Sequence, residues 1–205
     1  MPEDQGQGTN NKGKQKGEER TRRRRDALGL PVLKLDGGKK MGEVRELIFD
    51  GERKSLDGVL IKEDTLLSGG QVVQYSDIYS LGLDAVTLKK GSEVLKWGDI
   101  KKRREEASKA QGWPEPEKLL GKRLVTEAGR DLGMIDDLIF DAKGGKLEGY
   151  ELSGGLIKDV VDGKGFVPVP EQVTLGTDTV IVPADVEDTV QKSPVKADDD
   201  PEPEA

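Results

Sequence analysis

The nine residues Gly42–Asp50, GEVRELIFD, return as Gly133–Asp141, GMIDDLIFD, and this repeat decides the fold. Five of the nine positions are identical, at an offset of 91 residues. The same offset aligns Leu56-Asp57-Gly58 with Leu147-Glu148-Gly149, so the match continues beyond the strongest block. An unrelated pair of segments would not keep this register, and the pattern therefore indicates an internal duplication.

The duplication continues towards the C-terminus after a short insertion. Three residues are inserted in the second copy, and at an offset of 94 Gly82–Leu88 aligns with Gly176–Val182. The insertion falls within Ser153–Gly165, where Leu156, Ile157, Val160 and Val161 are spaced like one face of a helical turn. We expect these four residues to form either a plug that closes a barrel end or an apolar loop that docks a partner.

Each copy is typical of a run of short strands separated by glycine-rich turns. Strands this short, without helices between them, favour an all-β fold of two tandem small β-barrels, because closing a sheet removes its exposed edges. The expected strands are Pro31–Leu35, Gly42–Phe49, Leu56–Ile61, Val72–Tyr75 and Ala85–Leu88 in the first copy, and Lys122–Val125, Gly133–Phe140, Leu147–Leu152, Phe166–Val169 and Thr179–Val182 in the second.

A polar helix is predicted between the two copies. Asp99 can cap a helix that runs to about Gln111, where Gly112 and Pro114 end it. Because this helix is polar all round, we expect an exposed spacer that holds two semi-independent barrels apart. The predicted organisation is a disordered basic tail over 1–27, a first barrel over 28–96, a linker over 97–118, a second barrel over 119–188 and a disordered acidic tail over 189–205.

The two ends of the chain are predicted to be disordered because they have almost nothing apolar to bury. We therefore expect that removing residues 1–26 and 192–205 would leave the melting temperature nearly unchanged. The N-terminal end contains the only concentrated basic feature, Arg22, Arg23, Arg24 and Arg25. Such a run can attract phosphate groups or anionic lipid, although a solvated arm is the favoured interpretation.

The composition excludes most familiar catalytic chemistry. The chain of 205 residues has no His and no Cys, and its formal net charge is −7. Asp50 and Asp141 end equivalent strands and could serve as acids or metal ligands, but turn aspartates that accept backbone amide hydrogens are the simpler interpretation. Asp84 and Asp178 receive the same interpretation, and no glycine pair has the spacing of a phosphate-binding loop. We predict no catalytic, cofactor or metal residues.

Membrane insertion is also not expected. The apolar runs are at most three residues long, as in Leu47–Phe49, whereas a helix needs about 20 mostly apolar residues to cross a bilayer. The first 25 residues hold no apolar segment of the kind that a secretory signal requires. We therefore expect a cytoplasmic protein.

The order of these blocks resembles the PRC-barrel family in both copies. The carriers in the first copy are Gly29, Gly42, Leu47–Asp50, Gly58, Tyr75–Ile78, Gly82 and Asp84; those in the second are Gly121, Gly133, Leu138–Asp141, Gly149, Val169–Glu171, Gly176 and Asp178. The resemblance implies a barrel of roughly 70 residues that is used mainly for interaction. The family occurs in the reaction-centre H subunit and in a ribosome-maturation factor, but the tandem form looks more like the unassigned bacterial members.

The resemblance implies a non-enzymatic adaptor or regulatory module that binds a protein partner or itself. The alternative is an RNA- or ribosome-associated factor that uses the Arg-rich arm, and nucleic acid is the less favoured partner. In each LIF triplet the side chains alternate between the two faces of the sheet. Leu47, Phe49, Leu138 and Phe140 should therefore enter the core, while Ile48 and Ile139 face a second apolar contact. We expect Ile48, Ile139 and the apolar insert to contact the partner.

Overall fold

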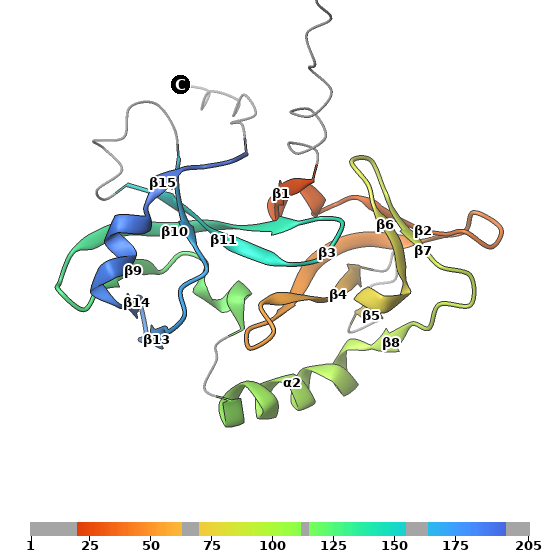
Figure 1. Cartoon of the computed structure of the whole chain (residues 1–205). Helices are drawn as coiled ribbons and strands as arrows, with labels where there is room; N and C mark the ends of the chain where they lie inside the picture. The colour runs from red at the N-terminus through yellow and green to blue at the C-terminus, as the bar shows by residue number, and fades with distance from the viewer. Residues whose placement is uncertain (1–19, 63–69, 112–114, 155–163, 196–205) are drawn as a thin grey trace, which may run out of the picture.

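The computed structural model describes residues 20–62, 70–111, 115–154 and 164–195. Its fold is mostly β, as predicted, with two sheets of seven and eight strands that lie side by side (Figure 1). The first sheet contains β2 (Pro31–Lys34), β3 (Lys40–Asp50), β4 (Ser55–Lys62), β5 (Gln71–Gln74), β6 (Ile78–Leu81), β7 (Val86–Leu88) and β8 (Leu95–Lys96). The second contains β1 (Thr21–Arg23), β9 (Arg123–Thr126), β10 (Asp131–Asp141), β11 (Leu147–Ser153), β12 (Gly165–Pro168), β13 (Thr174–Leu175), β14 (Thr179–Val182) and β15 (Gln191–Lys192).

The two sheets have the same strand order, which is the structural form of the sequence repeat. The first runs β6-β7-β2-β3-β4-β5-β8 and the second β13-β14-β9-β10-β11-β12-β15. Both contain one parallel pair, β2 with β7 and β9 with β14, among antiparallel ones. The ten predicted strands are all present, with ends shifted by at most two residues.

The long strands β3 and β10 bend at equivalent places. The pairing of β3 with β4 shifts between Val44 and Glu46, and that of β10 with β11 shifts between Ile135 and Asp137. Gly42 and Gly133 begin these segments at φ 138° and 125°, a backbone region that other residues rarely adopt. A Cβ at Gly42 would lie 2.3 Å from the Lys62 carbonyl oxygen. The glycine that opens each nine-residue repeat is therefore required for close strand contact.

One hydrophobic core serves both repeats. It contains the predicted core residues Leu47, Phe49, Leu138 and Phe140, each fully buried. The rings of Phe49 and Phe140 meet edge to face, with centroids 5.7 Å apart. The expectation of semi-independent barrels held apart by a spacer is therefore wrong, because the apolar faces of two small sheets gain more burial by facing each other.

The hairpins of the two repeats also exchange backbone hydrogen bonds symmetrically. Leu56 N donates to the Gly145 carbonyl at 2.6 Å, and its equivalent, Leu147 N, donates to the Lys54 carbonyl at 2.8 Å. An isolated bridge between Ser55 and Lys146 lies between these two bonds. Together with the facing phenylalanines, these contacts relate the repeats by a local pseudo-twofold axis.

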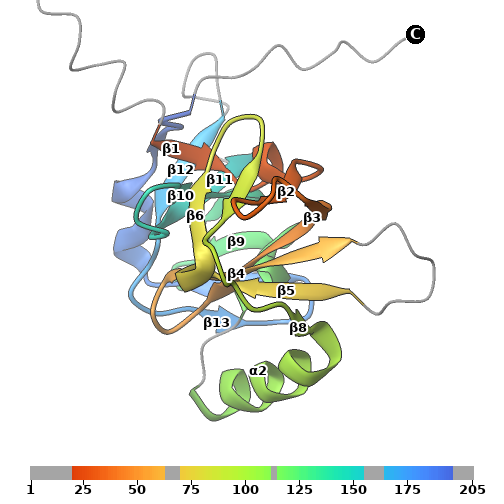
Figure 2. The ribbon, with the colours of Figure 1, turned by 90° about the vertical axis from the view of Figure 1, so that its right-hand side faces the viewer.

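The helix α2 (Trp97–Gln111) lies on the outside of the molecule, below β8, in Figures 1 and 2. Trp97 packs on a small second cluster formed by Ile48, Leu60 and Val72. Arg104 Nη2 donates to the Phe49 carbonyl at 2.7 Å and pairs with Glu117 at 3.1 Å. The polar helix is present as predicted, but it is fastened to the surface instead of separating the repeats.

Part of the predicted N-terminal tail belongs to the fold. Thr21–Arg23 forms β1, which pairs with Ile139–Asp141 of β10, and a 3-10 turn follows at Arg25–Ala27 with Ala27 fully buried. At the other end, β15 pairs with β12, beyond the predicted boundary at residue 188. The prediction of disorder is therefore wrong for residues 20–27 and 189–195, while residues 1–19 and 196–205 lie outside the described residues. The division into a first barrel over 28–96 and a second over 119–188 stays a prediction from the sequence repeat.

Candidate interaction surface

The apolar residues predicted to contact a partner are not on the surface. Ile48 packs in the cluster beneath Trp97 and is 2% exposed. Ile139 is fully buried, in register between Arg23 of β1 and Gly149 of β11. Both residues therefore face a second apolar or covered environment, as the alternation predicts, but the chain itself provides the cover. The proposed role of these two residues in partner binding is corrected accordingly. Leu156, Ile157, Val160 and Val161 lie outside the described residues.

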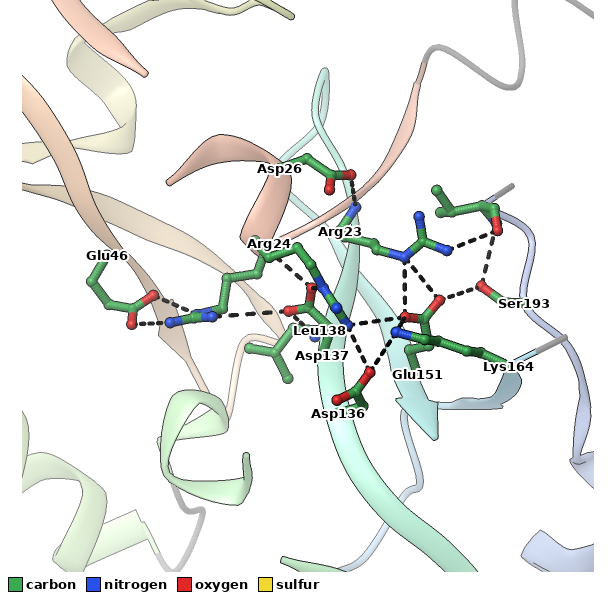
Figure 3. Close-up of polar contacts among 12 residues, drawn as sticks. Arg23, Arg24, Asp26, Glu46, Asp136, Asp137, Leu138, Glu151, Lys164 and Ser193 are labelled. Atoms are coloured by element: carbon green, nitrogen blue, oxygen red, sulfur yellow. Dashed lines mark hydrogen bonds and ion pairs between the residues drawn. The ribbon is translucent and has the colours of Figure 1, made fainter. Parts of the chain in front are cut away.

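The four consecutive arginines are held by contacts within the fold instead of forming a free arm. Three of them form ion pairs, and Figure 3 shows those of Arg23 and Arg24. Arg23 and Glu151 are almost completely buried, and the Arg23 Nε donates to both Glu151 carboxylate oxygens, at 2.9 and 3.0 Å. Ser193 Oγ donates to the same carboxylate at 2.8 Å, and Arg23 also donates to the Val195 carbonyl at 3.1 Å. This cluster joins the N-terminal segment, β11 and the C-terminal strand.

Arg24 lies between two equivalent acids, Glu46 of the first repeat and Asp137 of the second (Figure 3). It forms a bidentate pair with Glu46 and lies 4.0 Å from Asp137. Each acid also accepts from the next backbone amide, Leu47 N at 2.9 Å and Leu138 N at 2.8 Å. These contacts place a single arginine at the pseudo-twofold axis.

Arg25 completes the cluster at its edge. Its Nε donates to Asp137 at 2.6 Å and its Nη2 to Asp136 at 2.7 Å, while Lys164 donates to Asp136 at 2.7 Å. Burial acts to raise the pKa of Asp136, but the hydrogen bonds from Lys164 and Arg25 outweigh it and the pKa lies below its ordinary value. The acid is therefore held as a carboxylate.

The remaining arginine of the run, Arg22, is also committed to internal contacts. Its guanidinium donates to the carbonyls of Gly82 at 2.6 Å and of Asp26 at 2.9 Å, and more weakly to that of Leu81 at 3.4 Å. Because all four arginines have internal partners, the prediction that Arg22–Arg25 contacts an anionic partner is wrong. A local run of like charge looked solvated, but its counter-charges lie far away in the sequence.

Asp50 and Asp141 cap the turns that follow the long strands, as predicted. Asp50 accepts from Arg53 N at 2.7 Å, and Asp141 accepts from Lys143 N at 3.0 Å. Asp141 also holds Arg20, whose Nε and Nη2 donate at 2.8 and 2.7 Å. The hydrogen bond from Arg20 lowers the pKa of Asp141 despite its burial.

A groove with a volume of about 820 Å³ lies beside β6. It is lined by β6, by the turn Tyr75–Asp77 that precedes it, by Lys89 and Arg20, and by the turn Ala142–Lys143 between β10 and β11. The groove thus combines parts of both repeats and the N-terminal segment. β6 is the last strand of its sheet, so one of its edges has no neighbouring strand in the sheet order.

Two of the three tyrosines of the chain line this groove. The Tyr75 hydroxyl donates to the Lys143 carbonyl at 2.9 Å, and its ring packs on Gly145, where a Cβ would lie 2.8 Å away. Burial and the nearby Asp141 raise the pKa of Tyr75. Tyr79, in contrast, is 68% exposed. Tyr75 therefore fixes the groove between the repeats, and Tyr79 offers a free aromatic surface.

The described residues contain no group of three or more acidic side chains arranged to hold a metal ion. No helix in the described part of the chain is long and apolar enough to cross a membrane.

The comparison with protein families identifies the second repeat. The family model of the PRC-barrel domain matches residues 116–188, from the turn before β9 to the turn before β15. This part of the chain is a PRC-barrel domain. No curated protein matches the chain significantly. The PRC-barrel is a non-catalytic fold family whose members often mediate protein interactions.

The sequence interpretation missed both the ion-pair cluster and the groove. Glu151 stands inside the predicted strand Leu147–Leu152, and Asp137 occupies the position of Glu46 in the repeat. Charges within apolar strands need buried partners, so these acids were a signal that the arginine run is internal. For the groove, the only signal was the pair of tyrosines four residues apart, Tyr75 and Tyr79.

Proposed function

We propose that this protein is a non-enzymatic interaction module that docks a protein partner in the groove beside β6. We further infer that the first repeat is a second, diverged PRC-barrel, because its sheet has the same strand order. The observation that carries the docking proposal is the groove itself, in which Tyr79 of the edge strand β6 presents an exposed ring.

The position of Tyr79 favours a recognition role over a role in stability. A mostly exposed ring adds little to the core, whereas aromatic side chains are enriched at protein interfaces, where they bury a large area at little entropic cost. Leu83, two residues after β6, is also exposed, at 63%. The groove walls are fixed by backbone and tyrosine hydrogen bonds, so little ordering is needed on binding.

The alternative of an RNA- or ribosome-associated factor loses its main support. That interpretation depended on Arg22–Arg25 as a free arm, and these side chains are held by internal carboxylates and carbonyls. The net charge of −7 also opposes attraction to a phosphate backbone. We therefore propose a protein partner, which includes a second copy of this chain.

Site-specific photo-crosslinking tests the proposal. A photoreactive phenylalanine analogue placed at Tyr79 should capture a partner in the cells that express this protein. The control is the same analogue at Leu175, an exposed apolar residue on β13, the edge strand equivalent to β6. A Ser80→Trp substitution, which fills the groove from an exposed position, should abolish capture at Tyr79.

Three outcomes of this experiment are informative. Crosslinks at Tyr79 that are absent at Leu175 and lost with Ser80→Trp would support a docking groove. Crosslinks only to a second copy would identify self-association through this groove. Equal capture at both positions, or capture that Ser80→Trp does not change, would contradict the proposal.

A further inference from the structure

The groove beside β6 carries positive charge that ion pairs within the described residues neutralise only in part. Its lining includes three basic residues, Arg20, Lys89 and Lys143, and no carboxylate, although the chain as a whole has a net charge of −7. Arg20 is paired with Asp141 through two hydrogen bonds. Within the described part of the chain, Lys89 and Lys143 form no ion pair.

Lys89 and Lys143 both belong to segments that contact the turn Tyr75–Asp77. Lys89 Nζ donates to the Ser76 carbonyl at 2.6 Å, and its backbone N–H donates to the Asp77 carbonyl at 2.8 Å. Lys143 belongs to the turn whose carbonyl accepts from the Tyr75 hydroxyl. Two segments that contact the turn Tyr75–Asp77 therefore each contribute one lysine. Lys89 comes from the first repeat and Lys143 from the second.

The second repeat does not reproduce this chemistry. At the offset of 94, Tyr79 corresponds to Val173 and Lys89 to Pro183, and at the offset of 91 Lys143 corresponds to Glu52. The paired core positions are alike in the two repeats, as Phe49 and Phe140 show, because the fold requires them. The fold does not require a basic, aromatic groove, since the other repeat forms its sheet without one.

The shape of the surroundings distinguishes between anionic partners. A single strand of nucleic acid binds through successive bases stacked on successive rings. Here only Tyr79 has a free ring, because Tyr75 is packed on Gly145 and tied by its hydroxyl. An extended peptide, by contrast, matches a sheet edge, where it can add as a strand and place alternate side chains on the two sides.

We propose that the groove binds an acidic, extended segment of a protein partner. The segment lies along β6, its carboxylates face Lys89 and Lys143 at the Tyr75 end, and its apolar side chains pack on Tyr79. This inference rests on the proposed docking function and specifies the chemistry of the partner.

Titration with blocked hexapeptides tests the inference on the whole, isotopically labelled protein. The peptide EEEVTV should bind saturably, with a dissociation constant below about 1 mM. Amide shifts should be confined to residues 76–81 and 142–145. The isosteric peptide QQQVTV should bind about fivefold more weakly, because an exposed charge pair contributes up to about that factor.

A pair of double variants with identical net charge localises the effect. Lys89→Glu with Lys143→Glu should raise the dissociation constant of EEEVTV about tenfold or more, because it converts attraction into repulsion at both positions. Lys90→Glu with Lys146→Glu changes two exposed neighbours of these lysines that do not line the groove, and should raise it less than about threefold, by long-range attraction alone. Thermal melts of both variants establish that they are folded.

Several results would overturn the inference. These are no saturable binding of EEEVTV, equal binding of QQQVTV, an equal loss in both double variants, or occupancy of the groove by single-stranded oligothymidine in preference to the peptide. If partner capture at Tyr79 persisted while EEEVTV failed to bind, the docking function would stand and only the acidic chemistry would fall. Loss of both would remove the docking function as well.

Discussion

Replacing Arg23 by methionine should destabilise the protein far more than replacing an arginine in a surface ion pair. Arg23→Met keeps the length and apolar character of the side chain but removes the guanidinium from Glu151, which is fully buried. A charge left without its partner in the interior must bear its desolvation cost alone. The matched control is Arg130→Met, because Arg130 forms a pair of 3.2 Å with Glu187 in which both side chains are substantially exposed.

The expected magnitude follows from what remains around Glu151. Removing one partner of a buried pair costs about 3 to 5 kcal/mol. Arg25 and Lys164 stay within 3.3 and 3.5 Å of the same carboxylate and compensate in part, so the lower end, about 3 kcal/mol, applies. For a protein of this size that corresponds to a fall in the melting temperature of about 6 to 12 °C. Arg130→Met should cost about 1 kcal/mol or less.

Urea unfolding followed by circular dichroism measures these free energies of unfolding. The double variant Arg23→Met with Glu151→Met adds a second test, since replacing both members of a buried pair by apolar residues restores much of the stability. It should be more stable than Arg23→Met alone. Similar losses for Arg23→Met and Arg130→Met, both within about 1 kcal/mol, would refute the buried-pair argument.

Three further predictions follow from the fold. Removing residues 1–19 should leave the melting temperature within about 2 °C of the full chain, whereas removing residues 1–26 deletes β1 and should lower it by about 6 °C or more; equal melting of the two truncations in scanning calorimetry would contradict this. Phe49→Ala and Phe140→Ala should each cost about 3 to 5 kcal/mol in urea unfolding, with a coupling of about 1 kcal/mol in the double-mutant cycle; strict additivity would contradict the shared core. Arg20→Gln should lower the free energy of unfolding near pH 7, where Asp141 is ionised. This deficit should persist at every pH above the unfolded pKa of about 3.9, and it should vanish as the pH falls through the lowered pKa of the folded carboxyl. A deficit that acid does not change would exclude the ion pair as its cause.

The sequence was most informative where the physics is local. Alternation within Leu47–Phe49 correctly placed Leu47 and Phe49 in the core and Ile48 against a second apolar cluster, because successive side chains in a strand point to opposite faces. The glycine that opens each repeat is identical in both copies, and its positive φ explains why a glycine is needed there. The strands were also predicted correctly, because the apolar pattern that indicates a strand lies within the strand itself.

The sequence was least informative where a group depends on distant partners. Arg23 and Arg25 are held by acids that lie more than 110 residues away along the chain. These acids are Asp136, Asp137 and Glu151. No local window contains this information, so a run of arginines is indistinguishable from a solvated arm. The cover over Ile48 and Ile139 has the same character, because it comes from α2 and from β1.

The N-terminal segment makes the two repeats different from each other. Two equivalent acids, Glu46 and Asp137, lie on either side of the pseudo-twofold axis, yet the chain provides one arginine, Arg24, between them. The N-terminal segment therefore breaks the symmetry of the two repeats. The guanidinium groups of the arginines on either side of Arg24 each contact a single repeat: Arg22 the first, and Arg23 and Arg25 the second. Arg22 holds the carbonyls at the end of β6, and Arg20 lines the groove beside it. Because one segment both anchors the buried cluster and completes a single groove, the two repeats are free to differ at the positions where we propose that a partner binds.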